Sequence, residues 1–422
     1  MIYGISDSPK TIREWGLYAL QQVLAVFVAT VLIANICNTP VDACLVGAGL
    51  GTLLYQLITG FKSPMFISSC GATVSAVCGA LAIGNCGQNY LAVSIGGLVV
   101  FAIYALVAGA IRKYGISIID KYLPATIVGP ITMVIGANLA DFIATYVLIN
   151  GTHNDWGIIV ALITMFSVAL VSHYFKGFWK TIPFLLGLLI GYIVSVILTV
   201  TGIAPIVDFS VFKNLTVFNM PDFTFLKWDF STFNWTMVGQ VAIMFAPVAV
   251  CAISEHISDH KVLSNIIGVD LTHTPGLDKT LLGDGAASFL GTIVCGLPNT
   301  SYGESIATIG FSKVASVKVI SLAAIIIALL AFITPIQAFI QSIPACVFGG
   351  CAMVLYGYIF ASGLKTLLRS GADLEDNKNL IIVSVIITIG VSGIYLFHTS
   401  FAGVSLALVT GIILNLILKE KK

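Results

Sequence analysis

Four acidic residues stand in stretches of the sequence that are otherwise almost entirely apolar. Glu255 and Asp259 are four residues apart, so on a helix they share one face and can act together. Asp284 and Glu304 follow in two later apolar stretches. A charged carboxylate at membrane depth costs roughly 3 kcal/mol or more, and such a residue usually faces a cavity, a partner or a proton path. Binding of a polar solute and exchange of a proton are therefore the first chemistry that these residues indicate.

Protonation is the natural way to keep these acids inside an apolar protein. The sequence places no basic residue at comparable depth to neutralise them. Burial disfavours the charged form of a carboxyl group, so an acid without a counter-ion exchanges a proton more readily. We therefore expect Glu255, Asp259 and Glu304 to carry proton coupling.

A purely structural role is the alternative for each acid. Asp259 precedes the polar stretch at 260–261, where we expect a loop to begin, so a surface role competes with a functional one. Asp284 can equally cap or bridge helices beside Lys279. His256 points to another face of the helix than the glutamate before it, as a packed or interfacial histidine does.

Two short stretches combine Pro, Gly and small hydroxyl residues where membrane helices are expected. Residues 63–71 include Ser-Pro and Ser-Ser-Cys-Gly, and residues 298–304 read Pro-Asn-Thr-Ser-Tyr-Gly-Glu. Extended backbone at membrane depth frees N–H and C=O groups, which is tolerated only where they line a cavity or meet a ligand. A kinked helix or a surface loop is the alternative, but similar stretches in matching places of the two halves favour a binding site.

The rest of the chain must supply an apolar scaffold for these polar stretches. Of the 422 residues, 9% are charged and 58% hydrophobic, with a mean hydropathy of +1.02. A soluble domain carries roughly 25% charged residues, so the composition predicts an all-α integral membrane protein. The net charge of +1 and the lack of any block of like charges exclude a nucleic acid as the expected partner.

We expect fourteen membrane segments, each close to the ~20 residues that cross a bilayer as a helix. They are 15–37, 42–60, 65–83, 90–112, 122–148, 157–175, 181–202, 235–258, 279–297, 300–312, 316–340, 343–366, 378–397 and 400–418. Segments three and ten contain the short extended stretches. The long connection 203–234 is expected to be an extracytoplasmic loop with an aromatic part at the membrane interface.

Basic residues set the expected orientation. With this segmentation, every Lys and Arg except Lys213 and Lys227 falls at a terminus or in an even-numbered loop. Basic residues collect in cytoplasmic loops, so we expect both termini on the cytoplasmic side of the plasma membrane.

The two halves of the chain resemble each other at a nearly constant offset. Gln-Val at 22–23 recurs at 240–241, and Pro-Ala at 124–125 recurs at 344–345. Seven segments in each half is an odd number, so the second half enters the membrane from the opposite side. This predicts an inverted repeat of 1–202 and 235–422, an architecture of secondary transporters with a site at the repeat interface.

At these motifs the sequence resembles a known family. Ser254-Glu255-His256-Ile257, the Thr-Ser-Tyr-Gly-Glu stretch at 300–304, and the glycine-rich stretch 349–363 resemble the uracil permeases of the nucleobase–cation symporter, or nucleobase–ascorbate transporter, family. The likeness covers essentially the whole chain. It implies proton-coupled uracil import by alternating access, in which a core domain of segments 1–4 and 8–11 moves against a gate domain of segments 5–7 and 12–14.

The resemblance also implies roles for individual residues. Glutamates matching Glu255 and Glu304 hydrogen-bond the pyrimidine edge, and Tyr356 covers the base from the gate side. Uracil offers two N–H donors and two carbonyl acceptors, so carboxylates and main-chain N–H groups complement it. The candidate substrate-binding residues are Ala29, Cys70, Gly71, Glu255, Tyr302, Gly303, Glu304 and Tyr356.

Three positions depart from the family pattern. Asp259 stands where uracil permeases commonly have His, and an acid there is closer to the purine-transporting branch. Residues 305–307 replace the usual Asn-x-Gly, and Gly71 replaces an aromatic residue. Xanthine and urate carriers, however, tend to have Gln at the position of Glu304. We therefore expect uracil, with xanthine or another purine as the alternative.

Two further classes fit the sequence less well. An anion carrier of the sulfate-transporter type needs a positive site, and two carboxylates would repel its substrate. An enzyme is not expected, because no nucleophile–base pair, nucleotide-binding loop or metal-spaced His cluster is present in the sequence. We accordingly expect no cofactor and no metal, with the proton as coupling ion, and a possible homodimer in the lipid bilayer.

Overall fold

The computed structural model describes residues 1–84, 88–116, 123–147, 155–213, 216–392, 394 and 402–418. The described part is mostly helical and contains eight helices that are long and apolar enough to cross a membrane. The predicted ends of segments 5, 13 and 14, together with Lys121 and the C-terminal lysines, lie outside the described residues. The expectation of a multi-span helical membrane protein agrees with this architecture.

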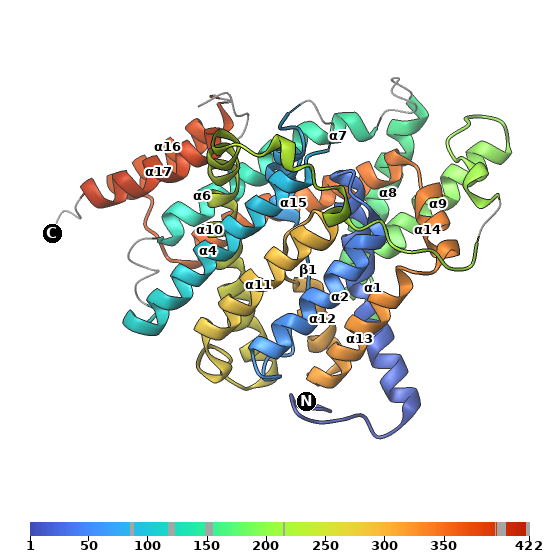
Figure 1. The fold of residues 1–422 in the computed structure, drawn as a ribbon, viewed down its shortest axis with the longest axis horizontal. Coiled ribbons are helices and arrows are strands. Elements are labelled where there is room, and N and C mark those ends of the chain that lie inside the picture. The colour runs from blue at the N-terminus through green and yellow to red at the C-terminus, as the bar shows by residue number, and fades with distance from the viewer. Residues whose placement is uncertain are drawn as a thin grey trace.

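The helices follow the predicted segments closely along most of the chain (Figure 1). They are α1 (Ile12–Ile36), α2 (Val41–Ile58), α3 (Val74–Leu81), α4 (Tyr90–Tyr114), α6 (Ala125–Asn138), α7 (Ala140–Tyr146), α8 (Asp155–Tyr174), α9 (Pro183–Val200), α10 (Trp235–Ile267), α11 (Leu277–Cys295), α12 (Gly303–Ser312), α13 (Val317–Leu330), α14 (Thr334–Ser342), α15 (Ala345–Arg369), α16 (Asn377–Val391) and α17 (Ala402–Ile417).

One group of helices packs around α2, α4, α11 and α13. Helix α11 lies against α2 and α4, α13 lies against α1 and α2, and α10 lies against α4. Small residues allow the close approach: a Cβ atom added at Gly97 would lie 2.0 Å from Thr292 Oγ1, and one at Gly49 would lie 2.4 Å from the Ala324 carbonyl oxygen. These close contacts make the group a tightly packed unit.

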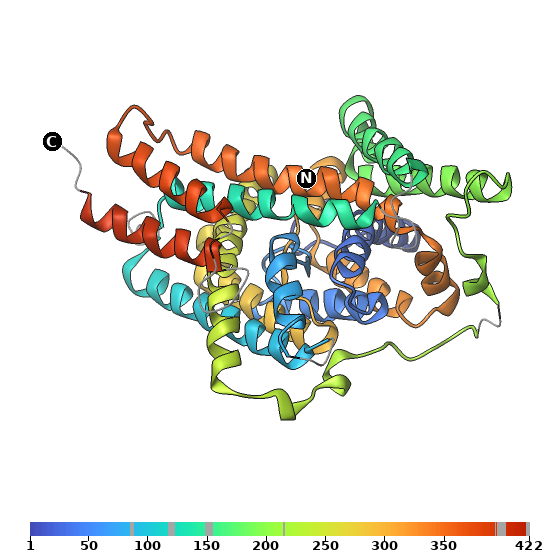
Figure 2. The same cartoon turned by 90° about the horizontal axis from the view of Figure 1, so that it is seen from above.

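A second group packs around α6 and α15, which lie side by side along one edge in Figure 2. Helix α15 also contacts α8, α8 contacts α9, and α16 contacts both α6 and α17. Here too glycine sets the distance, because a Cβ atom added at Gly136 of α6 would lie 2.5 Å from the Phe360 backbone nitrogen of α15. The two groups contact each other where α10 meets α6 and α17, and where α1 meets α9 and α15.

The two predicted extended stretches form a short antiparallel sheet in the middle of the protein. Strand β1 (Ile67–Ser69) pairs with β2 (Asn299–Ser301), with Ser68 opposite Thr300. Every residue of both strands is buried. Helix α1 supports the sheet, because Thr30 Oγ1 lies 2.6 Å from Ser68 Oγ. The expectation of extended backbone in segments three and ten is confirmed.

Helix α10 is longer than the sequence predicted. The expected end at residue 258, followed by a polar loop, is wrong, because the helix continues to Ile267 and ends at Gly268 with φ of 73°. A residue with positive φ is a common helix terminator, and glycine adopts it without steric cost. Residues 259–261 are therefore helical, and the His260 side chain is fully buried.

Segment eleven is not the single helix that we expected over 316–340. Helix α13 ends at Leu330, and α14 begins at Thr334 with Pro335 in its first turn, where the missing backbone N–H is tolerated. Between the two helices the chain pairs with residues 217–219 of the long connection. Asn219 N donates to the Phe332 carbonyl at 3.1 Å, and Thr334 N donates to the Val217 carbonyl at 3.1 Å. An extended partner segment thus replaces the helical bonds that end here.

The connection 203–234 runs along the edge of the molecule from α9 to the start of α10 in Figure 2. Its described residues form three short 3₁₀ turns, η3 (Phe209–Phe212), η4 (Thr224–Lys227) and η5 (Phe230–Thr232). Asp222 N donates to Asp42 Oδ2 at 3.0 Å, and Thr224 Oγ1 donates to the Ile293 carbonyl at 3.0 Å. Part of this connection is therefore held against α2 and α11.

Candidate functional site

A cavity of about 660 Å³ lies where the two helix groups meet at the short sheet. One wall comes from α1, α10 and the ends of β1 and β2, and the other from α6 and α15. Its deep part is lined by Ile33, Ser69, Cys70, Gly71, Val128, Thr132, Cys251, Ser254, Glu255, Ser258, Asp259, Thr300, Ser301, Tyr302, Gly303, Glu304, Leu355 and Ile359. The structure thus brings most of the predicted site residues into one space.

Three of the four predicted acids line this cavity. Glu255 and Asp259 lie one turn apart on α10, so both side chains reach the cavity from one helix face. Glu304 enters from the first turn of α12, directly after Gly303. Ser301 Oγ donates a hydrogen bond of 2.8 Å to Asp259 Oδ2, which ties α10 to the end of β2.

The ends of the two strands supply backbone polar groups to the same cavity. Cys70 precedes a 3₁₀ turn, η1 (Gly71–Thr73), and Tyr302 is the N-cap of α12. The first N–H groups of a helix have no backbone partner within the helix, so these turns place backbone donors beside the acids. Gly71 faces an apolar surface, because a Cβ atom there would lie 3.6 Å from Ile359 Cδ1 and 3.9 Å from Leu355 Cδ2.

Ala29 and Tyr356 lie outside this lining. Both are buried in the surrounding core, with 3% and 2% of their surface exposed. On α15 the cavity is lined by Leu355 and Ile359, which are four residues apart, whereas Tyr356 is turned about 100° around the helix from Leu355. The cavity lining therefore includes Ile33 of α1 and Leu355 of α15 but neither Ala29 nor Tyr356, and a role for these two residues in substrate binding stays a prediction.

The fourth acid, Asp284, belongs to a separate buried cluster behind β2. Its side chain is fully buried on α11 and accepts a hydrogen bond of 3.2 Å from Thr300 Oγ1. His256 Nδ1 lies 3.0 Å from the same carboxylate oxygen. Asp284 therefore connects α10, α11 and β2, which agrees with a bridging role, but its partners are Thr300 and His256 rather than Lys279.

This cluster continues along α10 to His260, which sequence reasoning placed in a loop. His260 Nε2 lies 2.8 Å from the Tyr55 hydroxyl and 3.3 Å from Ser63 Oγ, and all three side chains are buried. The two His rings are 4.1 Å apart. The available signal was the i, i+4 spacing of His256 and His260, which puts both on one helix face, turned about 100° from the face of the acids.

Strand β2 separates the cavity from this cluster. Successive side chains of a strand point to opposite faces, and here Ser301 contacts Asp259 while Thr300 contacts Asp284. Asp259 and Asp284 are thus held by neighbouring hydroxyl groups of one short strand.

The mouth of the cavity is basic. Lys261 on α10 and Lys365 and Arg369 on α15 line it, together with Ser362, Thr366 and Ser370. Lys261 lines the same cavity two residues beyond Asp259, so a basic residue lies near the acids although the sequence placed none at their depth.

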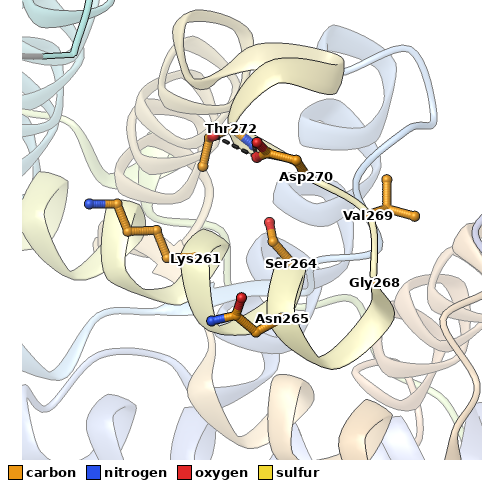
Figure 3. Close-up of a pocket in the computed structure, with 7 residues that line it drawn as sticks. All are labelled: Lys261, Ser264, Asn265, Gly268, Val269, Asp270 and Thr272. Atoms are coloured by element: carbon orange, nitrogen blue, oxygen red, sulfur yellow. Dashed lines mark hydrogen bonds between the residues drawn. The ribbon is translucent and has the colours of Figure 1, made fainter.

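A smaller surface hollow lies at the end of α10, shown in Figure 3. It is formed by Lys261, Ser264, Asn265, Gly268, Val269, Asp270 and Thr272. Two of its polar groups are engaged within the turn, because Ser264 Oγ accepts from Leu271 N at 3.0 Å and Asp270 Oδ1 accepts from Thr272 N at 2.9 Å. We therefore take the large cavity as the candidate site.

Comparison with known proteins decides the family. The Permease family model named Xan_ur_permease matches residues 13–399. The chain belongs to the xanthine/uracil permease family. Its relatives include the uracil permeases of Bacillus subtilis (strain 168), 34% identical over 99% of this chain and 95% of the relative, and of Escherichia coli (strain K12), 32% identical over 99% and 94%. The protein is therefore a multi-pass membrane permease.

Solved structures support this fold for the permease. The transmembrane domain of a cyanobacterium bicarbonate transporter, BicA, aligns with a TM-score of 0.58 at 14% identity, over 97% of this chain and 98% of that one. The murine Solute Carrier 26 family member A9 anion transporter aligns with a TM-score of 0.67 at 10% identity, over 97% and 69%. At these identities the likeness concerns the fold alone.

Proposed function

We propose that this permease imports uracil together with a proton by alternating access. The observation that carries the proposal is the joint placement of Glu255 and Glu304 on one cavity beside the ends of β1 and β2. Uracil permeases among the relatives support the choice of substrate. The xanthine alternative has one observation in its favour, the acid at Asp259.

The cavity offers what a pyrimidine needs on each of its surfaces. Carboxylates of Glu255 and Glu304 accept from the ring N–H groups, and N–H groups at the start of η1 and α12 donate to its carbonyls. The apolar side chains of Leu355 and Ile359 lie against the ring faces. Such a site holds a planar solute between a polar core wall and an apolar gate wall.

Proton coupling rests on the Glu255 and Asp259 pair. Two carboxylates one turn apart disfavour simultaneous ionisation, so one proton shared between them is the lower-energy state. Ser301 donates to Asp259 and so stabilises its charged form, which leaves the proton with Glu255 when the cavity is empty. Glu304 completes the set of acids that exchange a proton as the base binds.

Symmetric packing supports the inverted repeat and its division into core and gate. Helix α2 packs on α13 as α11 packs on α4, and α6 packs on α16 as α15 packs on α8. Strands β1 and β2 pair antiparallel, as equivalent segments of an inverted repeat do about a two-fold axis. In this scheme residues 1–202 and 235–422 are the two repeats, and the cavity lies between the core and gate domains.

The orientation follows from the basic residues, with both termini in the cytoplasm and the protein in the plasma membrane. The N-terminal stretch supports a shared side for the terminus and the α12–α13 connection, because Ile2 N donates to the Lys313 carbonyl at 2.7 Å. The basic mouth of the cavity then faces the cytoplasm, which makes this an inward-open conformation.

Uptake of labelled uracil into proteoliposomes tests the proposal. An inward proton gradient is expected to accelerate uptake, and uracil is expected to compete better than thymine, xanthine or hypoxanthine. Competition by xanthine alone would assign the permease to purines, and uptake indifferent to the gradient would remove the proton from the mechanism.

A further inference from the structure

We infer that the cavity also binds a pyrimidine nucleotide, uridine 5′-monophosphate, which enters through the basic mouth and inhibits transport. The inference rests on the proposed function, because the base occupies the same acidic end as uracil. The nucleotide's phosphate lies at the mouth, among Lys261, Lys365 and Arg369. The nucleotide would thus be a second ligand of the permease, and its concentration in the cytoplasm would control the rate of transport.

The charge of the cavity wall changes from negative to positive along its length. Its deep end carries the carboxylates, and its mouth carries three cations from the two facing helices, Lys261 on α10 and Lys365 with Arg369 on α15. Accumulation of basic residues on the cytoplasmic side explains why they lie at this end of the membrane. It does not require that they converge on the substrate cavity.

These cations are available to an anion. Within the part of the chain that the structure describes, no carboxylate lies within ion-pair distance of any of the three. Acids do follow α15 in the connection to α16, but they are engaged elsewhere. Asp373 Oδ1 accepts from Glu375 N at 2.9 Å, and Asp376 Oδ1 accepts from Lys378 N at 3.3 Å as the cap of α16.

The spacing between acid and cation fits a base joined to a phosphate through a sugar. Glu255 and Lys261 are six residues apart on α10, a rise of about 9 Å, and Ile359 and Lys365 have the same separation on α15. A nucleotide places its phosphate one ribose ring beyond the base. A free base spans only the acidic end, whereas a nucleoside monophosphate reaches both ends.

Hydroxyl side chains line the cavity along this span. Ser258 on α10 lies between Glu255 and Lys261, and Ser362 on α15 lies one turn before Lys365, at the start of the basic mouth. Hydroxyl groups both donate and accept, so they match the ribose hydroxyls. On α10 the order Glu255, Ser258 and Lys261 therefore follows the order of base, sugar and phosphate, and on α15 Ser362 precedes Lys365 as the sugar precedes the phosphate.

Other molecules also combine a uracil ring with an anionic group. Orotate is one of them, and its carboxylate is attached to the ring itself. Because Lys261 lies six residues beyond Glu255 on α10, a rise of about 9 Å, the phosphate of a nucleotide whose base contacts Glu255 reaches it and the ring carboxylate does not. Inorganic phosphate reaches the cations but leaves the base site open.

Competition binding on the purified full-length permease tests this inference. Displacement of labelled uracil is measured with uridine 5′-monophosphate, uridine, orotate and inorganic phosphate. The nucleotide is expected to displace uracil at concentrations roughly tenfold or more below uridine, since each charge-assisted contact contributes about that factor. Raising the salt concentration is expected to weaken the nucleotide and leave uridine unchanged.

A pair of variants separates the mouth from the base site. Lys365→Gln with Arg369→Gln is expected to remove the advantage of the nucleotide over uridine while uracil affinity stays at the wild-type value. Lys279→Gln, an exposed basic residue on α11 away from the cavity lining, is the matched control and is expected to change neither.

Three outcomes overturn the inference. Equal displacement by uridine and its monophosphate removes the phosphate site. Displacement of uracil by phosphate alone, or by orotate at concentrations as low as those of the nucleotide, assigns the cations to a different ligand. Uracil binding that the nucleotide leaves unchanged overturns this inference alone, whereas absence of uracil binding to the wild type overturns the proposed function and this inference with it.

Discussion

Replacing Glu304 by Gln removes one acceptor from the candidate base site with almost no change in shape. Glu304 lies in the first turn of α12 and faces the cavity shared with Glu255. Its amide replacement presents an N–H₂ group to a ring N–H, so an attractive contact becomes a contact between two donors. A hydrogen bond to a charged group contributes roughly 1.5–3 kcal/mol, which corresponds to a roughly 10- to 150-fold weaker affinity for uracil.

Equilibrium binding of labelled uracil to the purified Glu304→Gln protein measures this loss, and uptake into proteoliposomes measures its consequence. Glu375→Gln, in the exposed connection after α15, is the matched control and is expected to bind as the wild type does. Thermal unfolding of both variants shows whether the fold is retained. Affinity for uracil within twofold of the wild type in a folded Glu304→Gln protein would refute the assignment of Glu304 to the base, given the roughly tenfold minimum expected.

The remaining predictions concern coupling and packing. Asp259→Asn is expected to keep uracil affinity but to lose the stimulation of uptake by an inward proton gradient; unchanged stimulation would count against Asp259 as a proton carrier. Asp284→Ala leaves the Thr300 hydroxyl without its buried acceptor and is expected to cost about 1–3 kcal/mol of stability, read as a lower unfolding temperature. Gly136→Ala forces a methyl group against α15 and is expected to destabilise the protein by about 1–3 kcal/mol, whereas Gly357→Ala, which meets open space, serves as its control.

The elements that sequence predicted well are those with a local physical signal. Continuous apolar runs of membrane-crossing length define most helices, because the backbone in lipid has few other ways to satisfy its polar groups. The acids at Glu255, Asp259 and Glu304 stood out because charge is costly in such runs. Proline, glycine and hydroxyl residues marked β1 and β2 before any contact between them was known.

The features that sequence missed depend on contacts between distant parts of the chain. His260 looks like a loop residue until Tyr55 and Ser63, about two hundred residues earlier, are found beside its ring. A prediction based on the polar residues at 259–261 alone therefore ended α10 at residue 258, nine residues before its last residue, Ile267. The break after α13 likewise depends on pairing with residues 217–219. The apolar run itself contains no local signal that predicts this pairing.

Helix rotation accounts for the remaining differences at the site. Sequence indicated that α15 faces the cavity, but the facing residue is Leu355 rather than its neighbour Tyr356. One residue turns a helix by about 100°, so an apolar helix with weak amphipathic pattern does not reveal which side chain faces inward. The basic residues of α15 were assigned to a loop because the predicted segment ended at residue 366, whereas the helix continues to Arg369, and their place at the cavity mouth emerged only from the packing.

Binding of N-methylated bases tests the central claim most directly, that Glu255 and Glu304 accept the N–H groups of one pyrimidine. Uracil, 1-methyluracil and 3-methyluracil are compared as competitors of labelled uracil on the wild-type protein. Methylation removes one donor without changing the ring carbonyls, so we predict that each methylated base binds roughly tenfold or more weaker than uracil. Affinities of both methylated bases equal to that of uracil would contradict recognition by the two carboxylates.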